Sequence, residues 1–269
     1  MTRDLYALFG NPVSQSLSPV MMNAAFTKLN MPARYAAFQV DHAADIRKRM
    51  DTRSLRIRGA SVTIPHKVAV MDCLDGLTES AEAIGAVNTI IRADDRLTGD
   101  NTDWIGIVRA LSEHMEIAGS TFLIVGAGGT ARAALYGIIT KGGIPSVTSR
   151  SAVRGEALTK EFGCDFLHPD DLPGVRADCL INTTPLGMKG YGDASPVPAG
   201  ILERFTSVMD VIYNPPITKL LSDAAARGCT TISGVSMFVS QGAEQLRRWT
   251  GMKPPEELMK QVVMERLKT

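Results

Sequence analysis

Short apolar runs that suit β-strands alternate along the chain with longer amphipathic stretches that suit helices, a pattern typical of α/β layers. In the first hundred residues the pattern predicts strands over 4–9, 34–40, 56–62 and 87–92. A helix is predicted from Ser18, with Ser18 as its N-cap and Pro19 at the first helical position. A second helix is predicted to begin near Asp103 and to end before Gly119.

The pattern changes at residue 121. Residues 121–125 form a continuous apolar run, which is typical of a parallel strand buried on both faces. A glycine-rich segment and a helical stretch to about Lys141 follow directly. Further strands are predicted at 144–149, 178–182 and 207–212, with helices at 217–227, 235–249 and 255–267. Because 269 residues exceed the usual size of a single core, we expect two domains, divided near residues 103–118.

Charge and composition exclude several classes of protein. The 29 Lys+Arg balance 28 Asp+Glu, so no electrostatic footprint for nucleic acid is expected. Four separated cysteines without a CxxC pair indicate reduced thiols, and the four histidines have no metal-ligand spacing, so no metal site is predicted. With neither a signal peptide nor an apolar run of about 20 residues, we expect a soluble, cytoplasmic protein with no membrane partner.

The glycine-rich segment after residue 125 fits the G-x-G-x-x-A pattern of dinucleotide sites. It comprises Gly126, Ala127, Gly128, Gly129, Thr130 and Ala131. Such glycines let the backbone approach a pyrophosphate, and the N-terminus of the following helix donates N–H groups to it. A tight strand-to-helix turn without a ligand is the alternative, but the buried strand before the segment and the helix after it favour a dinucleotide.

The end of the next strand predicts which dinucleotide is bound. NAD sites usually place an acidic residue there, whereas this chain carries Ser149, Arg150, Ser151 and Arg154. Guanidinium groups are permanently charged and can bind a 2′-phosphate through two hydrogen bonds. Cations at a helix N-terminus are otherwise slightly unfavourable. The segment therefore predicts NADP as cofactor, an ordinary solvated helix start being the alternative.

Four polar clusters remain, each after a predicted strand, where functional sites are commonly built. They are residues 14–19, 61–67, 86–89 and 99–103. Each cluster alone could be a turn or a helix cap. Together and in this order they resemble the shikimate dehydrogenase family. The resemblance runs through GNPVSQSLSP, VTIPHK, GAVNT, NTDWIG, GAGGTARA, SRSAVR, NTTPLGM, DVIYNP and GVSMFVSQGAE, ending in WTG, and so covers nearly the whole chain.

The resemblance implies an N-terminal α/β substrate domain, 1–103 plus 236–269, and a Rossmann-type, doubly wound NADP-binding domain, 104–235. The implied reaction is the NADP-dependent, reversible reduction of 3-dehydroshikimate to shikimate, a step of aromatic amino acid biosynthesis. The catalytic pair would be Lys67 and Asp103. The substrate would also contact Ser16, Ser18, Thr63, Asn88, Tyr213 and Gln241. Besides the glycine-rich and arginine segments, the cofactor would contact Glu79, Val211, Gly234 and Met237.

The chemistry of alcohol oxidation agrees with this pair, since a hydride leaves to nicotinamide and a proton leaves to a base. Lys67 could exchange that proton while Asp103 positions it. Burial and a neighbouring carboxylate act oppositely on an amine's protonation, so the resting charge of Lys67 stays open. His66 is predicted to point the opposite way, because successive residues of an extended segment alternate in direction.

Some positions depart from the family pattern. Ser61 and Ser149 stand where the family usually has asparagine, and GVSM at 234–237 replaces the common GLGM. A relative acting on quinate or another shikimate analogue, and a non-catalytic NADP-binding sensor, are the alternative functions. The choice between a monomer and a homodimer is not determined by the sequence.

Overall fold

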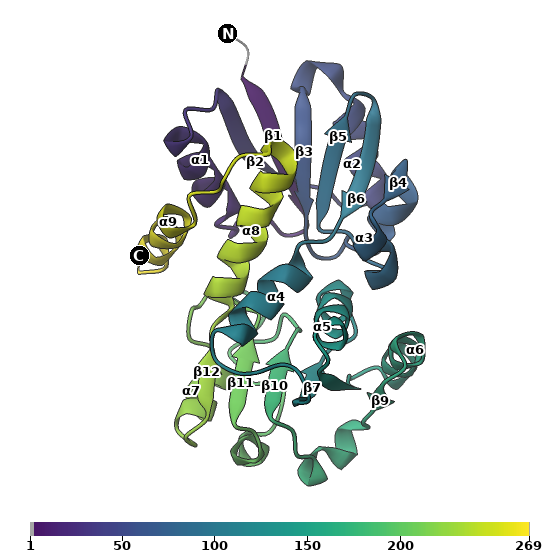
Figure 1. Ribbon diagram of the computed structural model, residues 1–269, viewed down its shortest axis with the longest axis vertical. Helices are drawn as coiled ribbons and strands as arrows, with labels where there is room; N and C mark the ends of the chain where they lie inside the picture. Colours follow the sequence, from purple (N-terminus) through teal and green to yellow (C-terminus); the bar gives the residue numbers. More distant parts are fainter. Residues whose placement is uncertain (1–2, 269) are drawn as a thin grey trace. The chain divides into compact units, whose positions relative to one another are not determined.

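The protein is described by a computed structural model covering residues 3–268. It divides into two compact units. Unit 1 contains the chain up to Thr102 and from Val239 onward, and unit 2 spans Asp103–Phe238. Each unit is an α/β structure built on its own six-stranded sheet (Figure 1). None of the described helices is both long and apolar enough to cross a membrane.

The sheet of unit 1 is mixed. Its strands are β1 (Asp4–Gly10), β2 (Ala33–Gln39), β3 (Ile57–Val62), β4 (Gly76–Leu77), β5 (Thr89–Ala93) and β6 (Arg96–Asp100), in the spatial order β2-β1-β3-β5-β6-β4. The pairs of β1 with β2 and β3 are parallel, whereas β5 runs antiparallel to both β3 and β6. The C-terminal ends of β1 and β3 and the N-terminal end of β5 therefore meet at one edge, where the polar clusters begin.

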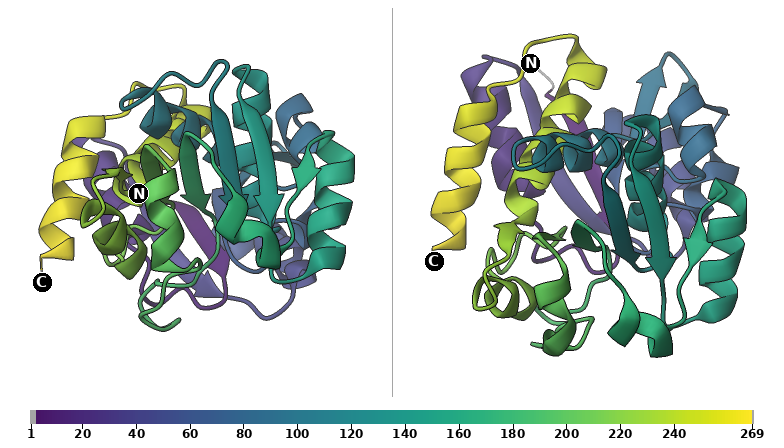
Figure 2. Two further views of the ribbon diagram at one scale, coloured as in Figure 1. Left: turned by 90° about the horizontal axis from the view of Figure 1, so that it is seen from below. Right: turned by 60° about the horizontal axis from the view of Figure 1, so that its bottom comes forward.

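Helices cover both faces of this sheet (Figures 1 and 2). The helices of unit 1 are α1 (Ser18–Lys28), α2 (Ala43–Asp51), α3 (Glu79–Ile84), the part of α8 (Gly234–Thr250) from Val239, and α9 (Glu256–Leu267). On one face the centroid of the Trp249 ring of α8 lies 5.1 Å from that of the Tyr6 ring. A Cβ at position 59 would lie 2.5 Å from the Trp249 ring, so this packing requires Gly59. On the other face Ile46 and Met50 of α2 join the apolar cluster around Phe9.

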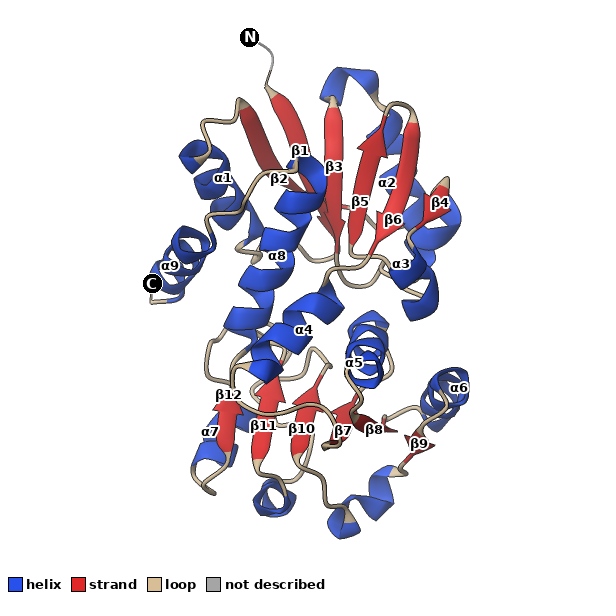
Figure 3. Ribbon diagram, in the orientation of Figure 1, coloured by secondary structure: helices blue, strands red, loops and turns tan. Residues whose placement is uncertain are grey.

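Unit 2 contains a parallel sheet of β7 (Thr121–Val125), β8 (Ile144–Thr148), β9 (Asp165–Phe166), β10 (Cys179–Asn182), β11 (Ser207–Asp210) and β12 (Thr230–Ile232). Its strand order is β12-β11-β10-β7-β8-β9. Besides α4 (Asp103–Ser112), the helices are α5 (Gly129–Thr140) and α6 (Ala152–Phe162) on one side of the sheet, and α7 (Lys219–Ala225) on the other (Figure 3). This doubly wound order has its switch point between β7 and β10, which confirms the predicted Rossmann-type fold.

Several local predictions need correction. Leu17, not Ser18, is the N-cap of α1, because the Ser18 hydroxyl interacts with that of Ser16 and caps no backbone N–H. The segment after Lys67 forms a single 3₁₀ turn, Ala69–Cys73. Strands β4, β6, β9 and β12 were not predicted, since each is short or, like β6, carries only one large apolar side chain. The remaining 3₁₀ turns are Arg53–Leu55, Pro169–Gly174 and Ala199–Arg204.

A buried carboxylate at the end of β11 links the stability of unit 2 to pH. Asp210 is fully buried and accepts hydrogen bonds from Thr218 Oγ1, Asn182 Nδ2 and the Ile212 N–H. Burial nevertheless outweighs these bonds and raises the pKa of Asp210 from 3.8 to about 6. The folded state therefore keeps this proton up to a higher pH than the unfolded state does. Its stabilising contribution is complete below pH 3.8 and is lost as the pH rises through about 6.

We expect Asp210→Asn to flatten this pH dependence, because asparagine cannot ionise and the Thr218 hydroxyl can rotate to accept from its amide. The pKa shift of Asp210 corresponds to about 3 kcal/mol. Urea unfolding measured from about pH 4 to 8 should therefore show a smaller loss of stability between roughly pH 4 and 6.5 in the variant than in the unmutated protein. Parallel curves for the two proteins would contradict this account of Asp210.

Candidate functional site

Two hydroxyls predicted to bind the substrate lie together at the start of α1. Ser16 Oγ is 3.2 Å from Ser18 Oγ, and the Ser18 backbone N–H donates to Ser16 Oγ. The turn that positions them is closed by a hydrogen bond from the Ser16 N–H to the Val13 carbonyl. This group follows β1, so its position is set by one of the central strands of the unit 1 sheet.

The Asn88 amide has a fixed orientation. Its Oδ1 accepts from the Thr102 backbone N–H at 2.8 Å and from Thr89 Oγ1 at 2.7 Å. Because a backbone N–H can only donate, the oxygen must face Thr102, and Nδ2 consequently points to Thr102 Oγ1 and, at 3.4 Å, to Gln241 Oε1. Asn88 and Gln241, both predicted substrate ligands, are thus brought together from the start of β5 and from α8.

The segment between β3 and the 3₁₀ turn carries Thr63 and Lys67, which are both half-buried. The Thr63 N–H donates to the Phe9 carbonyl, and the Lys67 carbonyl accepts from the Val87 N–H at 2.7 Å. Lys67 is therefore fixed beside the strand connection that leads to Asn88. His66 is buried, and its Nε2 lies 2.8 Å from the Val40 carbonyl, which gives this side chain a structural partner.

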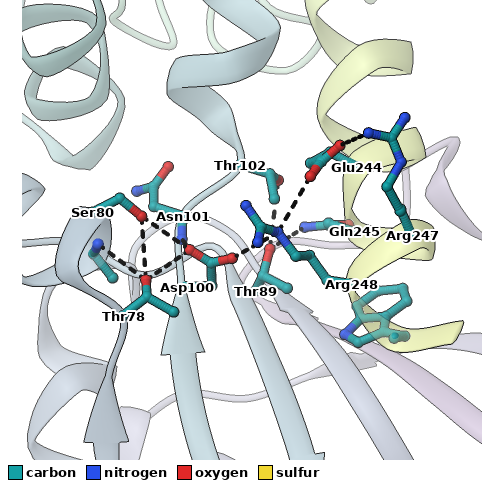
Figure 4. Close-up of polar contacts among 12 residues, drawn as sticks. Thr78, Ser80, Thr89, Asp100, Asn101, Thr102, Glu244, Gln245, Arg247 and Arg248 are labelled. Atoms are coloured by element: carbon teal, nitrogen blue, oxygen red, sulfur yellow. Dashed lines mark hydrogen bonds and ion pairs between the residues drawn. The ribbon is translucent and has the colours of Figure 1, made fainter. Parts of the chain in front are cut away.

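A charged network joins the end of β6 to the C-terminal half of α8 (Figure 4). Asp100 is 1% exposed, and its Oδ1 accepts from Thr78, Ser80 and the Asn101 N–H. Its other oxygen is 3.2 Å from Arg248 Nε, and Arg248 also pairs with Glu244. This network fixes the strand that leads into Asn101, Thr102 and Asp103.

The glycine-rich segment of unit 2 has the geometry of a phosphate-binding loop. Gly126 has φ +122°, and a Cβ there would lie 2.5 Å from Thr183 Oγ1, so the turn itself requires glycine. Gly128 precedes the first residue of α5 with φ −103°, and a Cβ on it would meet no atom within 4 Å. The N-cap Gly128 offers no side chain to cap the first turn of α5, and a helix N-terminus of this kind favours an anionic group. These residues fit a dinucleotide pyrophosphate.

The arginine segment follows β8. Ser151 is the N-cap of α6 and accepts from the Arg154 N–H. Arg150 and Arg154 are exposed, and neither forms an ion pair with any described residue. The Ser149 hydroxyl donates to the Ser151 carbonyl and accepts from the Ser151 N–H, so this predicted cofactor ligand also shapes the turn. Two uncompensated cations at a helix N-terminus fit a 2′-phosphate.

The other predicted residues have varied surroundings. Asp103 is 4% exposed and is the first residue of α4. The Tyr213 ring stacks on Phe238 with centroids 3.9 Å apart. A Cβ on Gly234 would lie 2.4 Å from the Val211 carbonyl oxygen, so these two cofactor candidates are in close contact. Met237 is buried in unit 2, and Glu79 is exposed at the start of α3 in unit 1.

Sequence reasoning missed the polar residues that support these sites. In unit 2, Asn182, Thr183 and Asp210 lie at the carboxyl ends of β10 and β11 and bond to one another or to the neighbouring strand. In unit 1, Gln245 is buried against Asn88 and Ser61. The signal for Gln245 was its spacing, since it follows Gln241 by four residues and so shares a helix face with it.

Gly128→Ala separates a ligand role from a structural one. We expect the variant to stay folded, because the added methyl group meets open space at an ordinary φ and the change costs only the difference between glycine and alanine as an N-cap. Its KM for NADP should nevertheless rise by roughly five- to 150-fold, since overpacking a close contact costs about 1–3 kcal/mol. Gly200→Ala, whose Cβ also meets open space, is the matched control. Unchanged NADP kinetics in Gly128→Ala would place the pyrophosphate elsewhere.

Comparisons with known proteins identify the family. Residues 8–90 match the model of the shikimate dehydrogenase substrate binding domain, and residues 234–264 match that of the shikimate 5'-dehydrogenase C-terminal domain. A shikimate dehydrogenase (NADP(+)) from Pyrococcus abyssi is 43% identical over 266 residues, covering 98% of each chain. The chain belongs to the shikimate dehydrogenase family.

Solved structures of family members have the same fold. A shikimate 5-dehydrogenase from Thermus thermophilus, in complex with NADP(H) and shikimate, matches with a TM-score of 0.88 and 32% identity over 97% of this chain and 99% of that one. A 5-ketofructose reductase of a Gluconobacter species matches with a TM-score of 0.83 and 31% identity over 99% of both chains. The fold of this family therefore also occurs in a protein named for a different substrate.

Proposed function

We propose that this protein is an NADP-dependent shikimate dehydrogenase, which interconverts 3-dehydroshikimate and shikimate. The observation that carries the proposal is the similarity over nearly the full length to relatives of about 40% identity named shikimate dehydrogenase (NADP(+)). The two loops of unit 2 that fit a pyrophosphate and a 2′-phosphate support the cofactor. The paired hydroxyls and paired amides of unit 1 support a small substrate rich in oxygen.

In this proposal unit 1 binds the substrate. Ser16 and Ser18 donate to the carboxylate of shikimate, and Thr63, Asn88 and Gln241 contact its hydroxyl groups, with Tyr213 of unit 2 as a further contact. These are neutral donors and acceptors, and the direction of the Asn88 amide is fixed by a backbone N–H. Such a set discriminates among polyhydroxylated acids through the hydrogen bonds that a wrong ligand leaves unmade.

Unit 2 binds the cofactor, whose nicotinamide ring supplies the acceptor or donor of hydride. Gly126–Ala131 and the N-terminus of α5 would hold the pyrophosphate, and Arg150 and Arg154 would bind the 2′-phosphate with Ser149 and Ser151 nearby. Val211, Gly234 and Met237 would line the ring, and Glu79 of unit 1 would contribute an acidic contact. The close packing of Gly234 on Val211 suits a surface against which a flat ring can lie.

Lys67 and Asp103 handle the proton in this mechanism. During oxidation the C–H bond of the alcohol breaks with its electron pair as hydride leaves, and the O–H proton passes to the Lys67 amine. In reduction Lys67 returns the proton to the carbonyl oxygen. Asp103, which is nearly buried, positions Lys67 and the substrate hydroxyl. The two side chains thus act as one unit.

Purified protein should reduce NADP when given shikimate, with much lower activity on quinate at the same concentration. The reaction is followed by the absorbance of NADPH. Turnover of quinate alone would assign the chain to a different substrate within the family. A folded protein that binds NADP, but neither turns over nor binds shikimate or quinate, would overturn the proposal and favour a non-catalytic NADP sensor.

We further propose that the enzyme acts in the cytoplasm, as a monomer or homodimer. The four thiols form no disulfide among the described residues, which suits a reducing compartment. Light scattering of the purified protein will determine which oligomer forms.

A further inference from the structure

A chain of buried hydrogen bonds joins β3, α8 and β5 beneath the Asn88 amide. Tyr35 OH donates to Ser61 Oγ, and Ser61 Oγ donates to Gln245 Oε1, both at 2.6 Å. Gln245 Nε2 then donates to the Asn88 carbonyl at 3.0 Å and to Thr89 Oγ1 at 3.1 Å. All five residues are at most 6% exposed. Gln245 and Thr89 are seen side by side in Figure 4.

The direction of every bond in this chain follows from one backbone group. The Asn88 carbonyl can only accept, so Gln245 must present its NH2 group there and its oxygen to Ser61. Ser61 must then donate to Gln245 and accept from Tyr35. Thr89 accepts a hydrogen bond from Gln245 and donates its own to Asn88 Oδ1. The chain therefore ends on the oxygen that sets the orientation of the Asn88 amide.

Ser61 consequently has no proton left for a ligand. A hydroxyl carries a single hydrogen, and that of Ser61 is committed to a buried amide oxygen. The family resemblance places an asparagine at this position, whose amide could reach a substrate hydroxyl. In this chain the amide next to Ser61 belongs instead to Gln245 of α8, which bonds to both Ser61 and the Asn88 carbonyl.

We propose that Tyr35, Ser61 and Gln245 are positioning residues, which together with the Thr102 N–H hold Asn88 in place and so maintain the contact of Asn88 and Gln241 with the substrate. This inference rests on the proposed role of Asn88 and Gln241 in binding shikimate. Ser61 acts only through Gln245 and does not touch the substrate. An unsatisfied donor or acceptor anywhere in the chain would be costly in so buried a place, so the three residues act together.

A double-mutant cycle with Ser61→Ala and Gln245→Met distinguishes positioning from direct binding. Methionine keeps the length of glutamine without its amide. Each single variant should raise the KM for shikimate by roughly five- to tenfold, the factor equivalent to one neutral hydrogen bond. The turnover number should fall less, and the KM for NADP should not change. The double variant should be no worse than the more affected single variant. Thr250→Ala, which removes a hydroxyl bonded to the Leu246 carbonyl of α8, is the control.

Additive effects in the double variant would overturn the proposal, because they would mean that Ser61 contacts the substrate independently of Gln245. An equal rise in the KM for NADP would also overturn it, since that indicates general loss of structure. A ligand-free measurement separates this inference from the proposed function. The ¹⁵N NMR signals of the Asn88 side-chain amide should shift in both single variants even if the protein does not turn over shikimate. Unchanged Asn88 signals in Ser61→Ala would refute the proposed positioning role of Ser61.

Discussion

Replacement of Lys67 by alanine is expected to lower the turnover number by about a hundredfold or more, the scale of a lost acid–base group. The protein should stay folded and bind NADP normally, because Lys67 is only half-buried and its backbone contact to Val87 does not involve the side chain. The KM for shikimate should change less, since the hydroxyls and amides of unit 1 would still bind the rest of the molecule. Steady-state kinetics with saturating NADP measure both parameters.

Lys260→Ala is a suitable control, because Lys260 is an exposed lysine of α9 in the same unit. Its loss should change stability by under about 0.5 kcal/mol and leave turnover intact. Asp103→Ala should also lower turnover. The double variant of Lys67 and Asp103 should lose less than the sum of the two free-energy costs if the residues act as one unit. Near-normal turnover of Lys67→Ala at neutral pH would mean that the proton travels through Asp103 or water.

Replacement of both Arg150 and Arg154 by alanine is expected to raise the KM for NADP by about a hundredfold or more, since hydrogen bonds to charged groups contribute about 1.5–3 kcal/mol each. The KM for NAD should hardly change, because NAD has no 2′-phosphate to bind these side chains. Both arginines are exposed and unpaired with described acidic groups, so stability should change little. Kinetics with each cofactor at saturating shikimate give the comparison.

Lys160→Ala controls for a general change in charge, because Lys160 lies in the last turn of the same helix, α6. It should leave both cofactor constants unchanged. Equal efficiency of the unmutated enzyme with NAD and NADP would contradict the role of the arginines. So would a double variant whose constants for the two cofactors rise together, since that would indicate damage to α6 rather than loss of a phosphate contact.

The Rossmann-type unit was predictable because its signals are local. The apolar run 121–125 is typical of a central strand, and the glycines after it mark the turn into α5. Of the hairpin formed by β5 and β6, only β5 was predicted, because Leu97 is the one large apolar residue of β6. A strand so polar forms through its pairing with β5 and not through its own hydrophobic pattern.

The candidate site was predicted less completely than the fold. Residues with a proposed chemical role, such as Lys67 and Asn88, could be found from polar clusters at strand ends. The residues that position them could not, because they come from distant parts of the chain. Ser61 and Gln245 are 184 positions apart, and Arg248 reaches Asp100 from a different element. Only tertiary packing reveals that such side chains meet, and each looks like an ordinary polar residue in the sequence.

The most direct test of the central claim is a crystal structure of the protein with shikimate and NADP bound. We predict that Lys67 Nζ and the Asp103 carboxylate both lie within about 3.2 Å of the oxygen of the alcohol that is oxidised. The substrate carboxylate should contact Ser16 and Ser18, and the 2′-phosphate should contact Arg150 and Arg154. A complex in which shikimate binds with no oxygen within hydrogen-bond distance of Lys67 would contradict the account.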